Sequence, residues 1–279
     1  MKQMFVSEPA RRGGLRLWLG KRYFCARRWL WWHTSGVRFA RRRPEFPCPV
    51  LCFRHSTPLL RKLKDVDMWM QRNKVHNLRL AVERLDGVVL LPGETLSYWK
   101  CIGDPRRRGY VEGMMLKNGQ VTSAVGGGLC QLANLIYWMT LHTPLTVTER
   151  YRHGYDVFPD SGRTQPFGSG ATCCYNYVDL MVRNDTDRPY RLALQVGKRD
   201  LEGAWYSDRP QPCTYQIYQA EHRMQGEYWG GYTRHNVIRR RVLDFTGELV
   251  GDELVTENHA IMMYNPLLEK GEGPFPDAE

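Results

Sequence analysis

One cysteine in this chain stands where proteins place reactive thiols. Cys130 follows three consecutive glycines and begins an apolar segment that reads as a helix. A thiol at a helix N-terminus faces unpaired N–H groups and the positive end of the helix dipole, which favour the thiolate. Glycines leave room for a ligand to approach the sulfur. The pattern predicts a nucleophile; the alternative is a buried structural cysteine behind an ordinary glycine turn.

A cysteine nucleophile usually needs a base, and the base needs an orienting group. His153 follows a predicted strand and is the candidate general base, and Asp179 on a later predicted strand is the candidate orienting acid. The order cysteine, histidine, acid is also that of papain-like and transglutaminase-like folds, which is an analogy of fold only. The alternatives are an ordinary surface histidine and a solvated or arginine-paired aspartate. Other candidates for the orienting group are Asn176, Asp156 and Asp160.

The residues near the cysteine also predict a binding site for an anionic or peptide ligand. The glycine run and the helix N-terminus suit a carboxylate or phosphate, and a glutamine amide beside the thiol suits an oxyanion. An adjacent acid and guanidinium suit a zwitterionic peptide or a sugar carboxylate. Strand neighbours point to opposite faces, so the alternative is that one member of that pair serves only the structure. The candidate binding residues are Gly126, Gly127, Gly128, Gln131, Glu149 and Arg150.

The net charge of +11 is confined to an N-terminal arm. Residues 1–43 contain twelve lysines and arginines and one acid, whereas residues 44–279 contain 28 basic and 28 acidic residues. Aromatic residues, tryptophan above all, are interleaved with the arginines of the arm. This combination suits an anionic membrane surface or packing of the arm on the body with arginines over tryptophan faces. Nucleic acid fits less well and is not expected as a partner.

Cysteine usage and hydropathy favour a cytoplasmic protein. Eight cysteines in 279 residues are too few for a disulfide scaffold. No two cysteine pairs have zinc-site spacing, so we expect no metal and no other cofactor. No apolar run is long enough to span a bilayer, and arginines interrupt every candidate signal segment. The expected location is the cytoplasm, at the inner face of the membrane.

Hydrophobic periodicity predicts an α+β fold in which two main helices pack against a mostly antiparallel sheet. Helices are expected over 65–86 and from Cys130 to just before Pro144. Asn118 and Gly119 predict a hairpin turn. Strands are expected over 88–91, 95–99, 146–151 and 171–183, with 190–196 as the hairpin partner of the last, and further on over 214–219 and 236–244.

The chain divides into four segments on the same grounds. Prolines mark an irregular connector after the arm, and short strands dominate the C-terminal part. The segments are a basic, tryptophan-rich arm at 1–43, a connector at 44–64, a main domain at 65–200 and a β-rich extension, packed on that domain, at 201–279.

Two runs of the sequence, from Gly126 to Leu132 and from Glu149 to His153, resemble motifs of the VanW family, which is named for a protein encoded in glycopeptide-resistance gene clusters. The similarity covers about residues 66–196. Where family members often read Gly-Arg-Asp before Ala-Thr, this chain has Gly168-Ser169-Gly170, which leaves Asp179 as the candidate acid. The matching motifs are Pro92-Gly93-Glu94-Thr95-Leu96-Ser97, Arg108-Gly109-Tyr110, Asn118-Gly119, the run from Gly126 to Leu132, the run from Glu149 to His153, Gly170-Ala171-Thr172, Asp179-Leu180 and Arg183-Asn184.

The resemblance implies a link to vancomycin resistance and the cell envelope, and it supplies no reaction. We therefore expect an accessory protein that acts on or binds a peptidoglycan-related peptide. If the protein is an enzyme, Cys130 is the nucleophile, and the reaction is acyl transfer or amide hydrolysis. The alternative is a non-catalytic module that binds a peptidoglycan precursor or another anion near the membrane surface.

Overall fold

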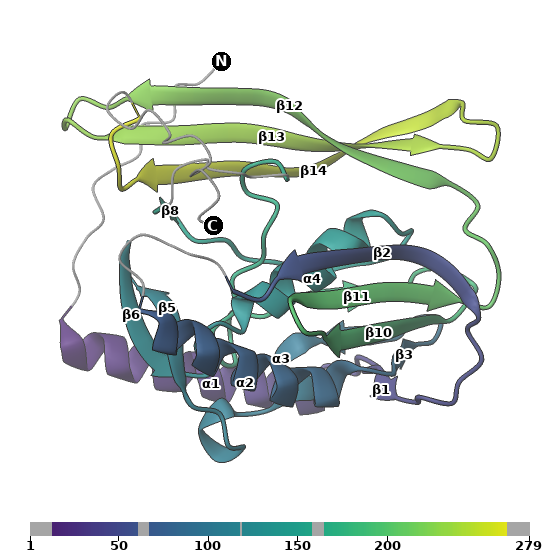
Figure 1. The fold of residues 1–279 in the computed structure, drawn as a ribbon, viewed down its shortest axis with the longest axis horizontal. Helices are drawn as coiled ribbons and strands as arrows, with labels where there is room; N and C mark the ends of the chain where they lie inside the picture. Colours follow the sequence, from purple (N-terminus) through teal and green to yellow (C-terminus); the bar gives the residue numbers. More distant parts are fainter. Residues whose placement is uncertain (1–12, 61–66, 118, 158–164, 267–279) are drawn as a thin grey trace, which may run out of the picture.

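Four sheets and four α-helices make up the part of the chain that the computed structural model describes, residues 13–60, 67–117, 119–157 and 165–266 (Figure 1). Most strand pairs are antiparallel, so the predicted α+β class is confirmed. Two helices join the two expected ones. The arm contributes α1 (Gly14–Thr34). The strand predicted over 95–99 ends at Ser97 instead, and its last two residues begin the short α3 (Tyr98–Ile102).

The largest sheet and two helices form the core. Helix α2 (Met68–Leu85) packs on β10, and α4 (Cys130–Leu141) packs on β11 and β2. Trp205 of β11 is fully buried, and its Nε1 donates to Thr140 Oγ1 of α4 at 3.2 Å. Burial of one such side chain contributes on the order of 3 kcal/mol. The strand order is β1 (Arg41–Arg42), β3 (Val88–Leu90), β10 (Tyr190–Val196), β11 (Asp200–Ser207) and β2 (Val50–Pro58).

Strand β2 lies inside the segment 44–64, where the sequence indicates an irregular connector. Pro49 precedes the strand and Pro58 is its last residue, so neither proline interrupts the ladder with β11. The main sheet therefore takes strands from both sides of the segment 65–200.

A three-stranded sheet shows that the pairing predicted for residues 171–183 is wrong. Only β9 (Met181–Arg183) is a strand there, and it lies between β4 (Thr95–Ser97) and β7 (Thr146–Glu149). Strand β10 pairs with β11 and β3 instead. The cause is the buried Asn184, whose Nδ2 donates to the carbonyl oxygens of Leu90 at 2.9 Å and Arg188 at 2.7 Å. These bonds direct the chain after β9 into the neighbouring sheet.

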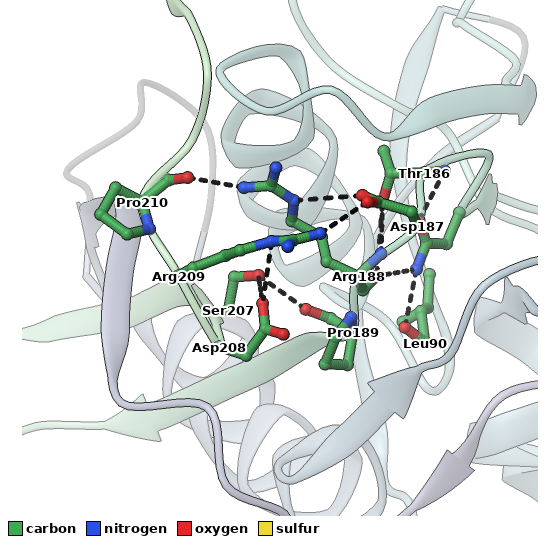
Figure 2. A network of polar contacts seen from close by, with 10 residues as sticks. Leu90, Thr186, Asp187, Arg188, Pro189, Ser207, Asp208, Arg209 and Pro210 are labelled. Atoms are coloured by element: carbon green, nitrogen blue, oxygen red, sulfur yellow. Dashed lines mark hydrogen bonds and ion pairs between the residues drawn. The ribbon is translucent and has the colours of Figure 1, made fainter.

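The turn after β9 is also tied to the residues that follow β11 (Figure 2). Arg188 Nη1 donates to the carbonyl oxygen of Pro210 at 2.5 Å, and Arg209 Nη2 donates to Asp187 Oδ2 at 2.6 Å. Since these contacts join the residues before β10 to those after β11, they hold this end of the β10–β11 pair in register.

The elements around the glycine run form as predicted. Strands β5 (Glu112–Lys117) and β6 (Gln120–Val125) make the hairpin, after a short 3₁₀ turn at Pro105–Arg107. Asn118 lies outside the described residues, and Gly119 has the positive φ of 77° that a tight turn favours. Helix α4 begins at Cys130 and ends before Pro144.

A long antiparallel ribbon lies along one side of the body (Figure 1, green to yellow). It consists of β12 (Thr214–Gly226), β13 (Tyr232–Leu243) and β14 (Leu249–Met262), and the end of β14 pairs in parallel with β8 (Tyr155–Asp156). Arg240 Nη1 donates to the carbonyl oxygens of Leu141 at 3.2 Å and Thr143 at 3.0 Å. The ribbon is thereby fastened to the end of α4. The sequence predicts β12 and β13 in part and misses β14.

Helix α1 contacts the body through the half that begins at Phe24. Trp32 is buried, Arg28 Nη2 pairs with Glu149 Oε1 at 2.6 Å, and Asn176 Nδ2 donates to the carbonyl oxygen of Cys25 at 3.2 Å. Residues 14–24 are exposed apart from the half-buried Gly20. Among the described residues of α1, those from Phe24 onward thus pack on the body, with the ring of Phe24 5.6 Å from that of Tyr177, and residues 1–12 lie outside the described part of the chain.

Candidate functional site

Cys130 occupies the predicted position as the first residue of α4, but its surroundings differ from the prediction. The residue is half-buried, and its Sγ lies 3.7 Å from the carbonyl oxygen of Cys173. Burial raises the pKa of the thiol, which is opposite to the effect expected from a helix N-terminus alone. The thiolate is therefore disfavoured in this structure.

The glycine run is packed against protein backbone. A Cβ on Gly127 would lie 2.0 Å from the carbonyl oxygen of Gly113 in β5, and a Cβ on Gly128 would lie 2.1 Å from Cγ of Lys74. The buried Asn77 joins α2 to the glycine run, because its Nδ2 donates to the carbonyl oxygen of Gly127 at 2.9 Å. These glycines permit close approach of α2 and β5, and Gly126 takes a positive φ of 79° in the same turn.

Asp179 is fully buried and holds the start of α3. Its Oδ2 accepts from Ser97 Oγ at 2.5 Å, and its Oδ1 accepts from the backbone N–H groups of Trp99 at 3.0 Å and Leu180 at 2.9 Å. Burial raises the pKa of this carboxyl to about 7, against the lowering effect of the Ser97 and Trp99 hydrogen bonds. The carboxylate is thus used to join β4, α3 and β9.

His153 lies in the loop between β7 and β8, half-buried, and burial lowers the pKa of its imidazole. Within the described residues, no hydrogen bond or ion pair links His153 to Cys130 or Asp179. The triad therefore stays a prediction. Of the alternative acids and amides, Asp160 lies outside the described residues, Asn176 binds Cys25 of α1, and Asp156 binds Arg234 at 3.2 Å.

Glu149 and Arg150 point to different partners, as strand neighbours do. Glu149 pairs with Arg28 of α1. Arg150 connects the core to the ribbon: Nε donates to the carbonyl oxygen of Gly170 at 2.8 Å, and Nη1 donates to Thr256 Oγ1 at 3.0 Å and Asn258 Oδ1 at 3.3 Å. Both charged groups are engaged within the protein.

Gln131 is also engaged. Its Nε2 donates to Thr57 Oγ1 at 3.0 Å and to the carbonyl oxygen of Pro58 at 2.9 Å, which fixes α4 on the end of β2. The amide that the sequence assigns to an oxyanion thus has two acceptors in the main sheet.

Buried residues that the sequence does not single out surround the Cys130 thiol. Tyr98 is fully buried, and its hydroxyl donates to the carbonyl oxygen of Leu129 at 2.8 Å. Burial, and then the nearby Cys173 and Cys130, raise the pKa of Tyr98 well above its usual value. Burial likewise raises the pKa of Cys173, with Cys130 and Asp179 as further causes. Cys130, Cys173, Tyr98 and Asp179 therefore share one neighbourhood that disfavours negative charge.

A pocket of about 730 Å³ lies where the segment after α1 meets the ends of α2 and α3. Four of its five arginines belong to the basic arm, and the fifth, Arg84, lies in α2. The sequence feature that could have indicated this pocket is a local cluster of charge, since four of the six residues in 38–43 are arginines. The lining residues are 37–43 together with Glu83, Arg84, Val88, Glu94, Ser97, Lys100 and Cys101.

No group of three or more histidine, cysteine, aspartate or glutamate side chains is arranged to hold a metal ion in the part of the chain that the structure describes. Among the same residues, no helix combines the length and the apolar character needed to cross a bilayer.

Comparison with known proteins places these features in a family. The model of the VanW like protein family matches residues 73–206. The chain is 34% identical over 236 residues to the vancomycin B-type resistance protein VanW of Enterococcus faecalis, covering 84% of this chain and 86% of that protein. It is 27% identical over 119 residues to the uncharacterized protein YoaR of Bacillus subtilis, covering 42% of this chain and 38% of that protein. No solved structure matches the fold.

Proposed function

This chain belongs to the VanW family, and on that premise we propose that it is an accessory protein of vancomycin resistance that works by binding at the membrane face of the cell envelope. Its ligand is an anionic, peptidoglycan-related compound, and its location is the inner face of the membrane. The observation that carries this proposal is the exposed first half of α1.

That half of α1 combines apolar and basic side chains with no acid. Leu15, Trp18 and Tyr23 are exposed by 73%, 56% and 62%, and the basic Lys21 and Arg22 lie between them. Indole and phenol rings favour the headgroup level of a bilayer, and lysine and arginine favour anionic headgroups. A helix with this composition and full exposure suits a position in the plane of a membrane surface.

The surroundings of Cys130 support binding over covalent catalysis. Burial opposes the thiolate, and the candidate acid, amide and guanidinium groups already have partners inside the protein. A nucleophile needs an adjacent base or a lowered pKa, and neither accompanies this thiol among the described contacts.

Vesicle sedimentation of the full chain tests the membrane position. We expect at least about tenfold stronger binding to vesicles of phosphatidylcholine with phosphatidylglycerol than to phosphatidylcholine alone, because several basic residues face the surface. The double variant W18S/Y23S is expected to lose about tenfold in affinity. The matched control is Phe245→Ser, which removes an aromatic ring that is 94% exposed in the turn between β13 and β14.

The same variants connect membrane binding to resistance. In cells that carry the chain within a vancomycin-resistance cluster, W18S/Y23S should lower the vancomycin concentration that the cells tolerate, whereas Phe245→Ser and Cys130→Ser should not. Equal binding to neutral and anionic vesicles, or an equal effect of the Phe245 control, contradicts the proposal.

A cysteine-dependent acyl transferase or amide hydrolase is the second candidate, favoured by the position of Cys130 at the first residue of α4. In that function Cys130 attacks a peptide carbonyl, with His153 as the base and Asp179 as the orienting acid. Incubation with a peptidoglycan stem peptide that carries an activated ester, followed by mass spectrometry, tests it. A covalent adduct on Cys130 supports the enzyme, and unchanged resistance with Cys130→Ser argues against it.

A further inference from the structure

The pocket between the segment after α1 and the ends of α2 and α3 has a strong excess of positive charge. Six cationic residues and two acidic residues, Glu83 and Glu94, are among those that line it, which leaves an excess of four positive charges. The cations come from three separate parts of the fold. They are Arg38, Arg41, Arg42, Arg43, Arg84 and Lys100.

Only one of the two carboxylates neutralises a cation there. Arg43 holds Glu94 with two hydrogen bonds, both of 3.1 Å. Arg38 and Arg42 donate to the carbonyl oxygens of Pro92 at 2.8 Å and Asp86 at 2.9 Å. A carbonyl oxygen fixes the guanidinium in place and leaves its full charge, so these bonds position the two arginines without neutralising them.

The other three cations have no carboxylate partner in the described residues. Lys100 Nζ lies over the rings of Phe39 at 4.6 Å and Trp32 at 5.5 Å. Arg41 and Arg84 are exposed, and within the described part of the chain neither makes an ion pair or a side-chain hydrogen bond. A concave site with four more cations than carboxylates attracts an anion.

The rest of the pocket suits a ligand with an organic body. The half-buried Val37 and Phe39 supply apolar wall, and a volume of about 730 Å³ lies within the range of small-molecule sites. An inorganic anion alone would leave most of this space unused. One phosphoryl group carries at most about two negative charges at neutral pH, so two phosphoryl groups match the charge excess better. Arginine forks also match phosphoryl oxygens in geometry.

We propose that this pocket binds an organic diphosphate, with Arg41 and Arg84 on the phosphoryl oxygens and the apolar wall against the organic group. The assignment rests on the proposed function in one respect, since it supplies the ligand class for the binding module. It does not depend on the contact of α1 with a membrane. The diphosphate can be carried by a soluble nucleotide-like compound or by a lipid headgroup.

Isothermal titration of the full chain with uridine diphosphate and with inorganic pyrophosphate, without vesicles, tests the site. The double variant R41Q/R84Q is expected to weaken binding of uridine diphosphate at least about tenfold, because each lost charge-assisted bond costs a substantial share of the affinity. The matched control is Arg79→Gln, an exposed arginine of α2 that does not line the pocket. Its affinity should stay within about twofold of the unmodified chain. Equal thermal unfolding temperatures show that the variants fold.

A second arm separates the two sources of the phosphate. Vesicles of phosphatidylcholine with a lipid diphosphate, diacylglycerol pyrophosphate, are sedimented with R41Q/R84Q and with W18S/Y23S. If R41Q/R84Q loses binding of uridine diphosphate but still binds vesicles, the pocket is assigned to soluble compounds. If R41Q/R84Q also loses vesicle binding, the pocket is assigned to lipid headgroups. If W18S/Y23S does not change vesicle binding, the membrane proposal is contradicted, and the assignment of a diphosphate to the pocket is unaffected. No binding of either diphosphate at millimolar concentration, or an equal loss in Arg79→Gln, overturns the pocket assignment.

Discussion

Arg28 Nη2 of α1 lies 2.6 Å from Glu149 Oε1 at the end of β7, and both side chains are largely buried. The backbone N–H of Asp179 donates to the same carboxylate oxygen at 3.3 Å. This single oxygen therefore joins the basic arm, β7 and the residues before β9. It also explains why an acid that the sequence assigns to substrate binding is occupied.

Removal of this ion pair should loosen α1. Arg28→Gln is expected to lower the free energy of unfolding by about 2 kcal/mol, between the values for exposed and buried pairs, because Glu149 then loses its partner. Urea denaturation measures the change, and proteolysis within α1 should become faster. Arg27→Gln, on the adjacent exposed position, should change stability by less than about 0.5 kcal/mol. Equal effects of the two variants would contradict this role.

The buried Asp179 should give the protein a specific pH dependence. Its pKa is raised from 3.8 to about 7 in the folded chain, mainly by burial. Between these values the folded chain binds more protons than the unfolded chain, so the contribution of this group to stability falls as the pH rises towards about 7 and then levels off. The free energy of unfolding of the unmodified chain, minus that of Asp179→Asn, should fall by about 2 kcal/mol between pH 5 and pH 8. The surface variant Asp187→Asn should leave that slope unchanged.

Burial of the Cys130 thiol predicts slow alkylation. At pH 8, iodoacetamide should modify Cys130 in the folded chain at least about tenfold more slowly than in urea, since only the thiolate reacts and burial raises the pKa. Mass spectrometry of the peptides gives the rate at each cysteine, with the half-buried Cys213 beside β12 as the internal reference. Preferential labelling of Cys130 at neutral pH would contradict this prediction and support Cys130 as a nucleophile.

Arg150 should be required for attachment of the ribbon. Arg150→Gln leaves the acceptors on Gly170, Thr256 and Asn258 without their donor, and a loss of about 3 kcal/mol is expected from breaking this partly buried network. Hydrogen exchange should become faster in β14 before it does in α4. The exposed Arg223→Gln on β12 is the matched control, and exchange in β14 should not respond to it.

Close packing at the glycine run makes Gly127 intolerant of substitution. Gly127→Ala puts a methyl group 2.0 Å from the backbone of Gly113, so β5 or α4 must move, at a cost of at least about 3 kcal/mol. Thermal unfolding and soluble yield measure it. Gly154→Ala, where nothing lies within 4 Å of the new methyl group, should behave like the unmodified chain. A stable Gly127→Ala protein would mean that this contact is loose.

Several elements follow from the sequence because their causes are local. The apolar spacing in α2, the proline after α4 and the glycine at position 119 act over a few residues, and each element forms where it is expected. The class of fold follows from the same patterns. The motifs around Cys130 likewise identify the family, which the similarity over 84% of the chain supports.

The partners of the site residues depend on contacts between distant parts of the chain. Glu149 meets an arginine 121 residues away, and Arg150 meets Asn258 across 108 residues. A sequence motif specifies a charged group, but packing decides whether a protein group or a ligand neutralises it. The same reason applies to the basic pocket, where Arg41, Arg84 and Lys100 converge from three elements. The sequence alone therefore determined the elements, the class of fold and the family. Only the tertiary structure decided that Asp179 joins buried strands and that Arg41, Arg84 and Lys100 have no carboxylate partner among the described residues, because burial and pairing exist only once the chain is folded.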